Sequence, residues 1–572
     1  MAETIISPGV FTRENDISFI QPAPAAVGAA IIGPTVKGPV EIPTVVTSYN
    51  DYSRKFGLTF ESGSTTQEYL TSIAVKSYFD QGGESVLVTR VVTGSFTPAT
   101  SSTITCQTGS LTNPFVLKTI GKGAIYNNTS TVRGDGSLDS GSADNVRWEI
   151  SNVDTGSGTF TVSIRQGNDT ANNKITLESF NNCSLDPNSP NYIASVIGDQ
   201  YQTLANGQIN TFGDYVNKSN YVYVSSVNHK TFNYLANDGV TIQSGSGYAF
   251  NQFLPVASTG SFGAATGTHN TVGDFFSGID SSTAKPQGLE DGNYTNVITL
   301  LGNKDDYQFN IISAPGLTKQ VNSTAVNSII SLAETRGDCI AVVDLVGYDV
   351  TTISTVTTQA KALNSSYAAS YWPWLQMQSS VGKNVWVPAS VVIPGVYAFT
   401  DNSSAPWFAP AGLVRGGLTG VIQAKKKLTR TERDTLYSSK VNPIATFPGT
   451  GIAVFGQKTL QTKASALDRV NVRRLLIELK KFIGNQGRNL VFEQNTIATR
   501  NRFLSAVNPY LESVVQQQGL FAYRVVMDDT NNTADVVDRN QLVGQIFIQP
   551  AKTAEFIVLD FVVEPTGATF GA

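Results

Sequence analysis

The sequence predicts an α+β and α/β multidomain protein with an α/β core, an inserted β-rich outer domain and an arm at each end. Three observations carry this prediction. In the second half of the chain, continuous apolar runs of strand length alternate with helical patterns. In the first half, a long stretch is rich in Ser, Thr, Gly and Asn. Both terminal segments are apolar, although free chain ends are usually polar.

The chain begins with an arm and a small α/β unit. Residues 1–20 show no helical period and lead into a pair of prolines, so we expect an arm that docks on something or stays flexible. Residues 21–92 follow, with a helical pattern over 66–79 and a strand over 86–92. They are expected to form the N-terminal part of the core.

Residues 93–295 have the pattern of an inserted β-rich outer domain. Short runs of alternating apolar and polar residues, such as TFTVSIRQ at 159–166 and YVYVSSV at 221–227, are separated by frequent turn signals. The composition returns to that of the core near residue 295. We therefore expect a peripheral module whose two ends lie close together.

An α/β domain is expected over residues 296–440. Its apolar runs are continuous, which is typical of strands that are buried on both faces of a largely parallel sheet. Expected strands and helices alternate along the chain: strand 309–315, helix 321–336, strand 339–345, helix 353–363 and strand 367–377.

The C-terminal inner domain, residues 441–552, contains the clearest helical pattern. From 468 to 483 apolar residues recur at three- and four-residue spacing, and Gly484 stands where a C-cap belongs. A second helical pattern over 497–518 is interrupted at Pro509, so we expect two helices that meet there.

The chain ends in strand-like runs. Two of them, 521–527 and 541–548, belong to the C-terminal inner domain, and a third, 554–563, lies in a C-terminal arm over residues 553–572. Because this third run is apolar, it suits a strand donated to another sheet as well as a strand of the chain's own sheet. The sequence leaves both possibilities open.

The composition argues against several classes of function. A net charge of −4 disfavours a protein that grips phosphate backbones, so no direct nucleic-acid partner is expected. Two histidines, and three cysteines without a CxxC pair, indicate no catalytic residues, no metal site and no cofactor. Neither a secretory signal nor a membrane span is expected from the apolar runs. The profile is that of a non-enzymatic assembly protein.

Basic residues of the 468–483 helix lie off its apolar stripe: Arg469, Arg473, Arg474, Lys480 and Lys481. Two interpretations are open. The residues form a solvated face, or they dock on an acidic partner surface, since Arg in particular suits interfacial ion pairs. Spacing alone does not choose between these interpretations.

Several motifs occur in order along about two thirds of the chain: SPGVFTRE at 7–14, GPTVKGPVEIPTVVTSYNDYSRKFG at 33–57, GGESVLVTRVV at 82–92, SYWPW at 370–374, VPASVVIPGVYAFTD at 387–401, PWFAPAG at 406–412, VNPIATFPGTGIAVFGQKTL at 441–460, VNVRRLLIELKKFI at 470–483, VFEQNT at 491–496 and FVVEPTGATF at 561–570. Together these motifs resemble the tail sheath proteins of contractile-tailed bacteriophages. The β-rich segment has no such counterpart, as expected of outer decorations that differ between sheaths.

The resemblance implies a subunit that polymerises as stacked rings, six subunits per ring, around an inner tail tube. Contraction then drives the tube through the host envelope during genome delivery. The implied partners are other copies of the chain, the tail tube protein, and baseplate and tail terminator proteins. The implied location is the virion tail, assembled in the host bacterial cytoplasm.

The resemblance also implies roles for particular residues. Sheath subunits are linked by terminal arms that add strands to a neighbour's sheet. The arm residues are Ile5, Ile6, Val10, Phe11, Phe556, Val558, Leu559 and Phe561. The C-terminal part of the chain forms the inner surface in this family, which makes Arg473, Arg474, Lys480 and Lys481 the expected tube-facing residues.

Other functions fit the sequence less well. A phage-derived contractile injection particle or bacteriocin would use the same kind of sheath, but the long β-rich segment favours a phage. A β-rich surface adhesin would need a signal peptide. A serine hydrolase would need a histidine, and none occurs between residues 270 and 572.

Overall fold

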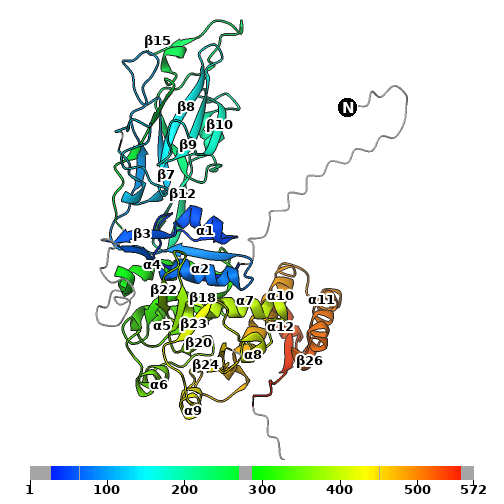
Figure 1. Cartoon of the computed structure of the whole chain (residues 1–572). Coiled ribbons are helices and arrows are strands. Elements are labelled where there is room, and N and C mark those ends of the chain that lie inside the picture. Colours follow the sequence, from blue (N-terminus) through cyan, green and yellow to red (C-terminus); the bar gives the residue numbers. More distant parts are fainter. Residues whose placement is uncertain (1–26, 63–64, 130, 269–285, 450, 556–572) are drawn as a thin grey trace, which may run out of the picture.

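The computed structural model describes residues 27–62, 65–129, 131–268, 286–449 and 451–555. They form a β-rich domain, a central α/β domain and a smaller C-terminal lobe, arranged as Figure 1 shows. At this level the predicted α+β and α/β fold class is confirmed. No helix in these ranges is long and apolar enough to cross a lipid bilayer.

The central domain is built on one eight-stranded sheet. In spatial order its strands are β2 (Thr44–Val46), β5 (Val86–Arg90), β1 (Val27–Gly33), β18 (Phe309–Thr318), β19 (Ile340–Asp344), β20 (Ala368–Trp372), β24 (Asn442–Phe447) and β25 (Gly451–Val454). Neighbours from β5 to β24 pair in parallel, whereas β2 and β25 pair antiparallel at the edges. The predicted largely parallel sheet is confirmed.

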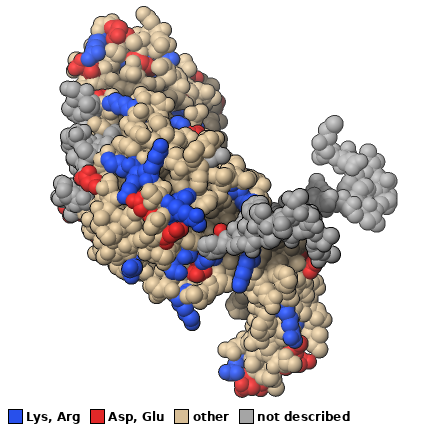
Figure 2. Space-filling model, turned by 60° about the horizontal axis from the view of Figure 1, so that its bottom comes forward, with Lys and Arg blue, Asp and Glu red and all other residues tan. Residues whose placement is uncertain are grey.

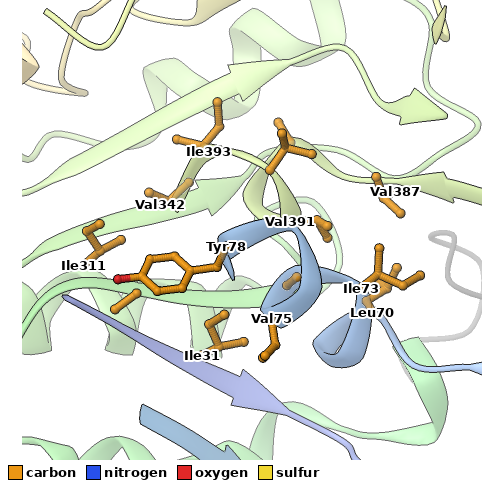
Figure 3. Packing of buried hydrophobic residues seen from close by; sticks show 14 of the residues in the cluster. Ile31, Leu70, Ile73, Val75, Tyr78, Ile311, Val342, Val387, Val391 and Ile393 are labelled. Atoms are coloured by element: carbon orange, nitrogen blue, oxygen red, sulfur yellow. The ribbon is translucent and has the colours of Figure 1, made fainter. Parts of the chain in front are cut away.

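Helices cover both faces of this sheet because its strands carry apolar side chains on both sides. Every residue of β5 and β19 is buried. On one face, Ile73 and Tyr78 of α2 pack with Ile31, Ile311 and Val342 of three strands (Figure 3). The helices of this face are α1 (Tyr49–Phe56), α2 (Leu70–Asp80) and α7 (Ile393–Ser403). Those of the other face are α4 (Asp291–Leu301), α5 (Ser323–Arg336), α6 (Ile353–Lys361) and α9 (Arg430–Ser438).

Two predicted domain boundaries fall inside the central domain and are wrong. Helix α4 begins at Asp291 and packs in the central core, so the predicted end of the insertion at residue 295 cuts this helix. Strand β24 pairs with β20, so the C-terminal part does not begin at residue 441. Both errors have one cause: composition along the chain does not report which core a helix packs in or which strand a segment pairs with.

The predicted strand 367–377 is also wrong, because the run divides at Pro373 between two sheets. Strand β20 stays in the large sheet, whereas the next strand joins a separate sheet of three. The strands of that sheet are β21 (Leu375–Gln378), β22 (Asn384–Val387) and β23 (Val421–Ala424). Smaller elements of the central domain are β3 (Thr59–Ser62), β4 (Thr65–Glu68) and α8 (Gly412–Arg415).

The inserted domain contains two four-stranded antiparallel sheets around one core, as predicted for a β-rich domain. One sheet has β13 (Val222–Val227), β7 (Phe115–Lys122), β6 (Pro98–Ser101) and β17 (Phe262–Gly263). The other has β10 (Thr176–Ser184), β9 (Thr159–Gln166), β8 (Val146–Asp154) and β16 (Ser258–Gly260). The remaining elements are α3 (Ile193–Ile197) and the pairs β11 (Tyr201–Ala205) with β12 (Gln208–Phe212) and β14 (Ser244–Gly245) with β15 (Tyr248–Ala249).

The two ends of the insertion meet at the core. The Thr97 amide donates to the Thr266 carbonyl at 3.2 Å, so the chain enters and leaves at one place. Beside this point, Arg90 is 1% exposed. Its guanidinium donates to the carbonyls of Gly38 in the core and Lys122 in the insertion, each at 2.8 Å. The insertion is thus held against the core by a buried cation.

The C-terminal lobe packs two long helices against a two-stranded sheet. Its elements are α10 (Val470–Arg488), α11 (Ile497–Gln516), β26 (Leu520–Val526), α12 (Ala534–Asp538) and β27 (Gln545–Pro550). The predicted C-cap at Gly484 is wrong, because α10 continues past it and Arg488 pairs with Asp305 of the central domain at 2.9 Å. Helix α11 also continues through Pro509, so the predicted break is wrong as well. Buried Val507 and Leu511 on either side of this proline hold the helix in the lobe core.

Candidate functional site

The predicted arm residues lie outside the described part of the chain: Ile5, Ile6, Val10, Phe11, Phe556, Val558, Leu559 and Phe561. So does most of the expected strand 554–563. Residues 551–555, which the structure does describe, carry no strand. The arms therefore stay a prediction, and the geometry begins at the elements next to them.

The structure gives Arg473 and Arg474 of α10 partners within the chain. Both residues are 4% exposed. Arg474 donates from Nη2 to both carboxylate oxygens of Asp401 in α7, at 2.6 and 2.5 Å, and lies over the Tyr397 ring. Arg473 donates to the Ser366 carbonyl at 3.2 Å, and burial lowers its pKa. The expectation that these two side chains present a charged surface to a partner is wrong for this subunit.

The two lysines of α10 are less enclosed. Lys480 is exposed and donates from Nζ to the Tyr367 hydroxyl at 3.0 Å. Lys481 is half-buried and donates to the side-chain carbonyl of Asn310 on β18, and burial lowers the pKa of Lys481. The basic side of α10 is therefore a joint between the lobe and the central domain. Sequence reasoning missed this joint because Asp401, the acid that completes it, lies 73 residues away in the chain.

Glu555, the last described residue, is held by three side chains of the central domain and the start of the lobe. Arg469 donates to its carboxylate from Nε at 2.6 Å and from Nη2 at 3.0 Å. The Tyr437 hydroxyl donates at 2.8 Å and Gln457 Nε2 at 3.1 Å. Hydrogen bonds from Arg469 and Tyr437 lower the pKa of Glu555 against the opposing effect of burial. The point from which residues 556–572 continue is thereby anchored.

The sheet of the C-terminal lobe has open edges. Strands β26 and β27 pair only with each other among the described residues. One face of this sheet packs in the lobe core beside α11. Phe521 and Phe547 are instead 80% and 55% exposed. A two-stranded sheet of this kind is able to accept further strands at its edges.

A buried carboxyl group in the central sheet was also missed by sequence reasoning. Asp344 ends β19 and is 4% exposed. It accepts hydrogen bonds from the hydroxyl and the amide of Ser390, at 2.5 and 3.2 Å. Burial raises the pKa of Asp344 to about 7. The pair ties β19 to the segment that leads into α7.

The described residues contain no group of three or more His, Cys, Asp or Glu side chains placed to hold a metal ion. Their site features are the joint at Arg474, the anchor at Glu555 and the open edges of the β26–β27 sheet. Residues 289–460 match the central domain of phage tail sheath proteins, and residues 462–564 match their C-terminal domain. In these two stretches the chain is similar to the phage tail sheath family.

Two curated relatives are tail sheath proteins of phages. The chain is 43% identical over 188 residues to the tail sheath protein of Vibrio phage KVP40, an alignment that covers 33% of this chain and 28% of the relative. It is 34% identical over 279 residues to the tail sheath protein of Enterobacteria phage T4, which covers 45% and 42%. The chain thus spans less than half the length of these relatives.

A solved structure shows the same fold. The sheath tail protein from Listeria innocua superposes with a TM-score of 0.51 at 11% identity, covering 92% of this chain and 96% of that chain. The likeness extends over nearly the whole of both chains, including parts of this chain outside the two matched sheath domains.

Proposed function

We propose that this chain is a tail sheath protein, the structural, non-enzymatic subunit of a contractile phage tail. Copies of the chain polymerise as stacked hexameric rings around a tail tube, contact the baseplate and the tail terminator, and contract to drive the tube through the host envelope. The observation that carries the proposal is the match of both sheath domains, in order, over the central domain and the C-terminal lobe. The virion tail is the proposed location, with assembly in the host cytoplasm.

A phage-derived injection particle or bacteriocin is the alternative use of the same subunit. Curated relatives from three phages favour the phage tail. The two uses differ in what the sheath is attached to. Purified particles that carry a DNA-filled head support the phage tail, whereas headless contractile particles support the alternative.

Strand exchange by the terminal arms is the proposed link between subunits. Two features support it: the open edges of β26 and β27, and the Glu555 anchor, which sets where the C-terminal arm begins. Each added main-chain hydrogen bond contributes only about 0.5–1.5 kcal/mol net, but several bonds per arm, repeated around every ring, link subunits firmly.

Two truncations test the arms by sedimentation of polymers. Deleting residues 2–18 removes the N-terminal arm, and deleting 556–572 removes the C-terminal arm while Glu555 keeps its contacts. We expect each truncated chain to stay folded, as judged by circular dichroism, and to remain unpolymerised. A normal polymer from either truncation contradicts the strand-exchange proposal for that end.

The tube-facing role is proposed now for Lys480 alone among the four basic residues, because Lys480 is exposed, Arg473 and Arg474 are buried, and Lys481 is half-buried against Asn310. A charge reversal, Lys480→Glu, is expected to weaken assembly of sheath on tube, most clearly at low salt where screening is least. Sheath polymers without tube should still form. If Lys480→Glu leaves the salt dependence of sheath assembly on the tube unchanged, Lys480 makes no contact with the tube.

A further inference from the structure

A cleft of about 1290 Å³ lies between the inserted domain and the central domain. Three parts of the chain form it: the outer face of the sheet that contains β7 and β13, helix α1 of the central domain, and the hairpin of β11 and β12. Its described lining residues lie between positions 37 and 225, outside the stretches that match sheath domains. The cleft is larger than the roughly 300–1,000 Å³ of most small-molecule pockets, so it suits an extended ligand.

The floor of the cleft sets a lysine beside two tyrosines. Burial alternates along β7, and Lys118 and Ile120 occupy the less buried positions, on the face away from the core of the inserted domain. Lys118 is the register partner of Tyr223 on β13. The Ile120 amide donates to the Tyr221 carbonyl at 2.9 Å, which places Tyr221 two residues before Tyr223 on the same face.

Helix α1 supplies the wall opposite this floor. Burial raises the pKa of Tyr221, and the Glu178 carboxylate raises it further, whereas the Arg54 guanidinium of α1 lowers it. Tyr221 is thus within electrostatic reach of Glu178 in the inserted domain and of Arg54 in the central domain. Beside them Lys37 and Asp144 form an ion pair at 3.0 Å that joins the two domains at the cleft.

The hairpin of β11 and β12 forms a third wall that is held at both ends. Near its base the Tyr201 ring stacks on Tyr223 of the floor at 5.5 Å and on Phe212 at 5.1 Å. At its tip Gly207 packs so closely on Thr299 of α4 that an added Cβ would lie 2.8 Å from Thr299 Cγ2. Figure 1 shows β12 at the junction of the two domains. The cleft is therefore preformed, so a ligand would not have to order its walls.

The charges in the cleft favour an anionic ligand. Basic lining residues outnumber acidic ones five to three. Two of the acids, Asp144 and Asp51, already pair with lysines, at 3.0 and 2.9 Å. Glu178, the third acid, accepts hydrogen bonds from Ser219 and Asn220. Lys118 has neither an ion pair nor a side-chain hydrogen bond within the described part of the chain.

Charge alone does not single out the cleft. Figure 2 shows Lys and Arg side chains gathered on the surface of the central domain as well. What distinguishes the cleft is that its basic groups lie within three walls, together with tyrosines and amide side chains. Ligand recognition sites combine such concave enclosure with a few convergent polar groups.

The uncharged groups of the cleft fit a sugar. Amide side chains line it, and each offers both a donor and an acceptor, as a sugar hydroxyl does. They belong to Gln166, Gln200, Gln202, Asn217 and Asn220. Tyr221 stacks on no other ring of the described residues, which leaves a ring face for the C–H face of a sugar. A nucleic-acid strand would need several such free rings, and Tyr201 is already stacked on two neighbours.

We infer that the cleft between the inserted domain and the central domain binds an acidic oligosaccharide. Lys118 and Arg54 pair with its carboxylates, Tyr221 stacks on a sugar ring, and the amide side chains bind hydroxyl groups. This inference goes beyond the proposed function, and its failure would leave the sheath role in place.

Isothermal titration calorimetry of the full chain tests the site, at a concentration below that at which the chain polymerises. The probes are tetragalacturonate, an acidic tetrasaccharide, and maltotetraose, a neutral one of equal length. We expect tetragalacturonate to bind with a dissociation constant below about 1 mM, about tenfold more tightly than maltotetraose, and to bind more weakly as salt is added.

Two substitutions locate the bound sugar. Lys118→Met removes the charge and Tyr221→Leu removes the ring, and each is expected to weaken tetragalacturonate binding about tenfold. Melting curves show whether each variant is folded. The control is Lys230→Met, which removes an exposed lysine of the inserted domain that does not line the cleft and should leave binding unchanged.

Several results would overturn the inference. They are no binding of either probe, equal binding of the two probes, and binding that folded Lys118→Met and Tyr221→Leu chains retain in full. Tighter binding of an eight-residue oligothymidylate than of tetragalacturonate would assign the cleft to nucleic acid and overturn it as well. Polymerisation of the full chain is measured separately, so none of these results bears on the proposed function.

Discussion

Replacing Arg474 by Met removes the charged side of the joint between α10 and α7 while keeping an apolar stem. Arg474 is 4% exposed, and its guanidinium contacts both oxygens of Asp401. Removing one member of a fully buried ion pair costs about 3–5 kcal/mol, because the remaining charge is left without a partner. Asp401 keeps 25% of its side chain in water, which reduces this cost. We expect the free energy of unfolding to fall by about 2–3 kcal/mol.

The assay is urea unfolding of the full chain, with limited proteolysis to show whether the C-terminal lobe detaches first. Lys463→Met is the control, since Lys463 is exposed and lies outside the joint. A double-mutant cycle with Asp401→Asn isolates the pair from other effects. If Arg474→Met unfolds within about 0.5 kcal/mol of the unchanged chain but fails to assemble on the tube, the joint is refuted and the tube-facing interpretation of Arg474 is restored.

Three further predictions concern the rest of the chain. Burial raises the pKa of Asp344 to about 7, so the folded chain keeps this carboxyl protonated at pH values where the unfolded chain, with a pKa of about 4, ionises it. The free energy of unfolding should therefore fall by up to about 4 kcal/mol as the pH rises from about 4 to about 7. Asp344→Asn should abolish this fall, and melting curves that shift equally with pH in both chains contradict the prediction. Gly484→Ala should stabilise α10 by about 0.5–1 kcal/mol in urea unfolding, since Gly484 lies inside the helix with no atom within 4 Å of an added Cβ; a loss of stability contradicts this. Replacing residues 98–265 by a short Gly/Ser linker should leave a folded chain that still polymerises. The free energy of unfolding should fall by about 1–2 kcal/mol, because Arg90 loses its hydrogen bond to the Lys122 carbonyl. A chain that no longer sediments as polymer would place the insertion in the contacts between subunits.

The sequence predicted the layers of the fold well where the signal is local. Continuous apolar runs at β18 and β19 identified buried parallel strands, and alternating runs identified the β-rich insertion. Local patterns could not show that β24 pairs with β20, since that pairing joins residues 71 positions apart, Tyr371 and Asn442. Pairing between distant segments leaves no mark in composition.

Helix ends and the candidate site were predicted less well, for a related reason. Pro509 disfavours a continuous helix, but buried Val507 and Leu511 on either side of it outweigh the local preference. Helix α10 runs past Gly484 to Arg488, which pairs with Asp305 of the central domain. Arg473 and Arg474 lie off the apolar stripe of α10 and so appeared to be solvent-facing. Each is instead buried against a residue that the fold brings from far away, Ser366 and Asp401. Asp344 gave no local signal of any kind.

Negative-stain electron microscopy of the purified full chain tests the central claim most directly. Imaging is done across a concentration series, with and without the tail tube protein. We expect tubes or short stacks of rings with sixfold end views, longer and of defined length when the tube is present. A chain that stays monomeric at every concentration, with and without the tube, would contradict the account of this protein as a sheath subunit.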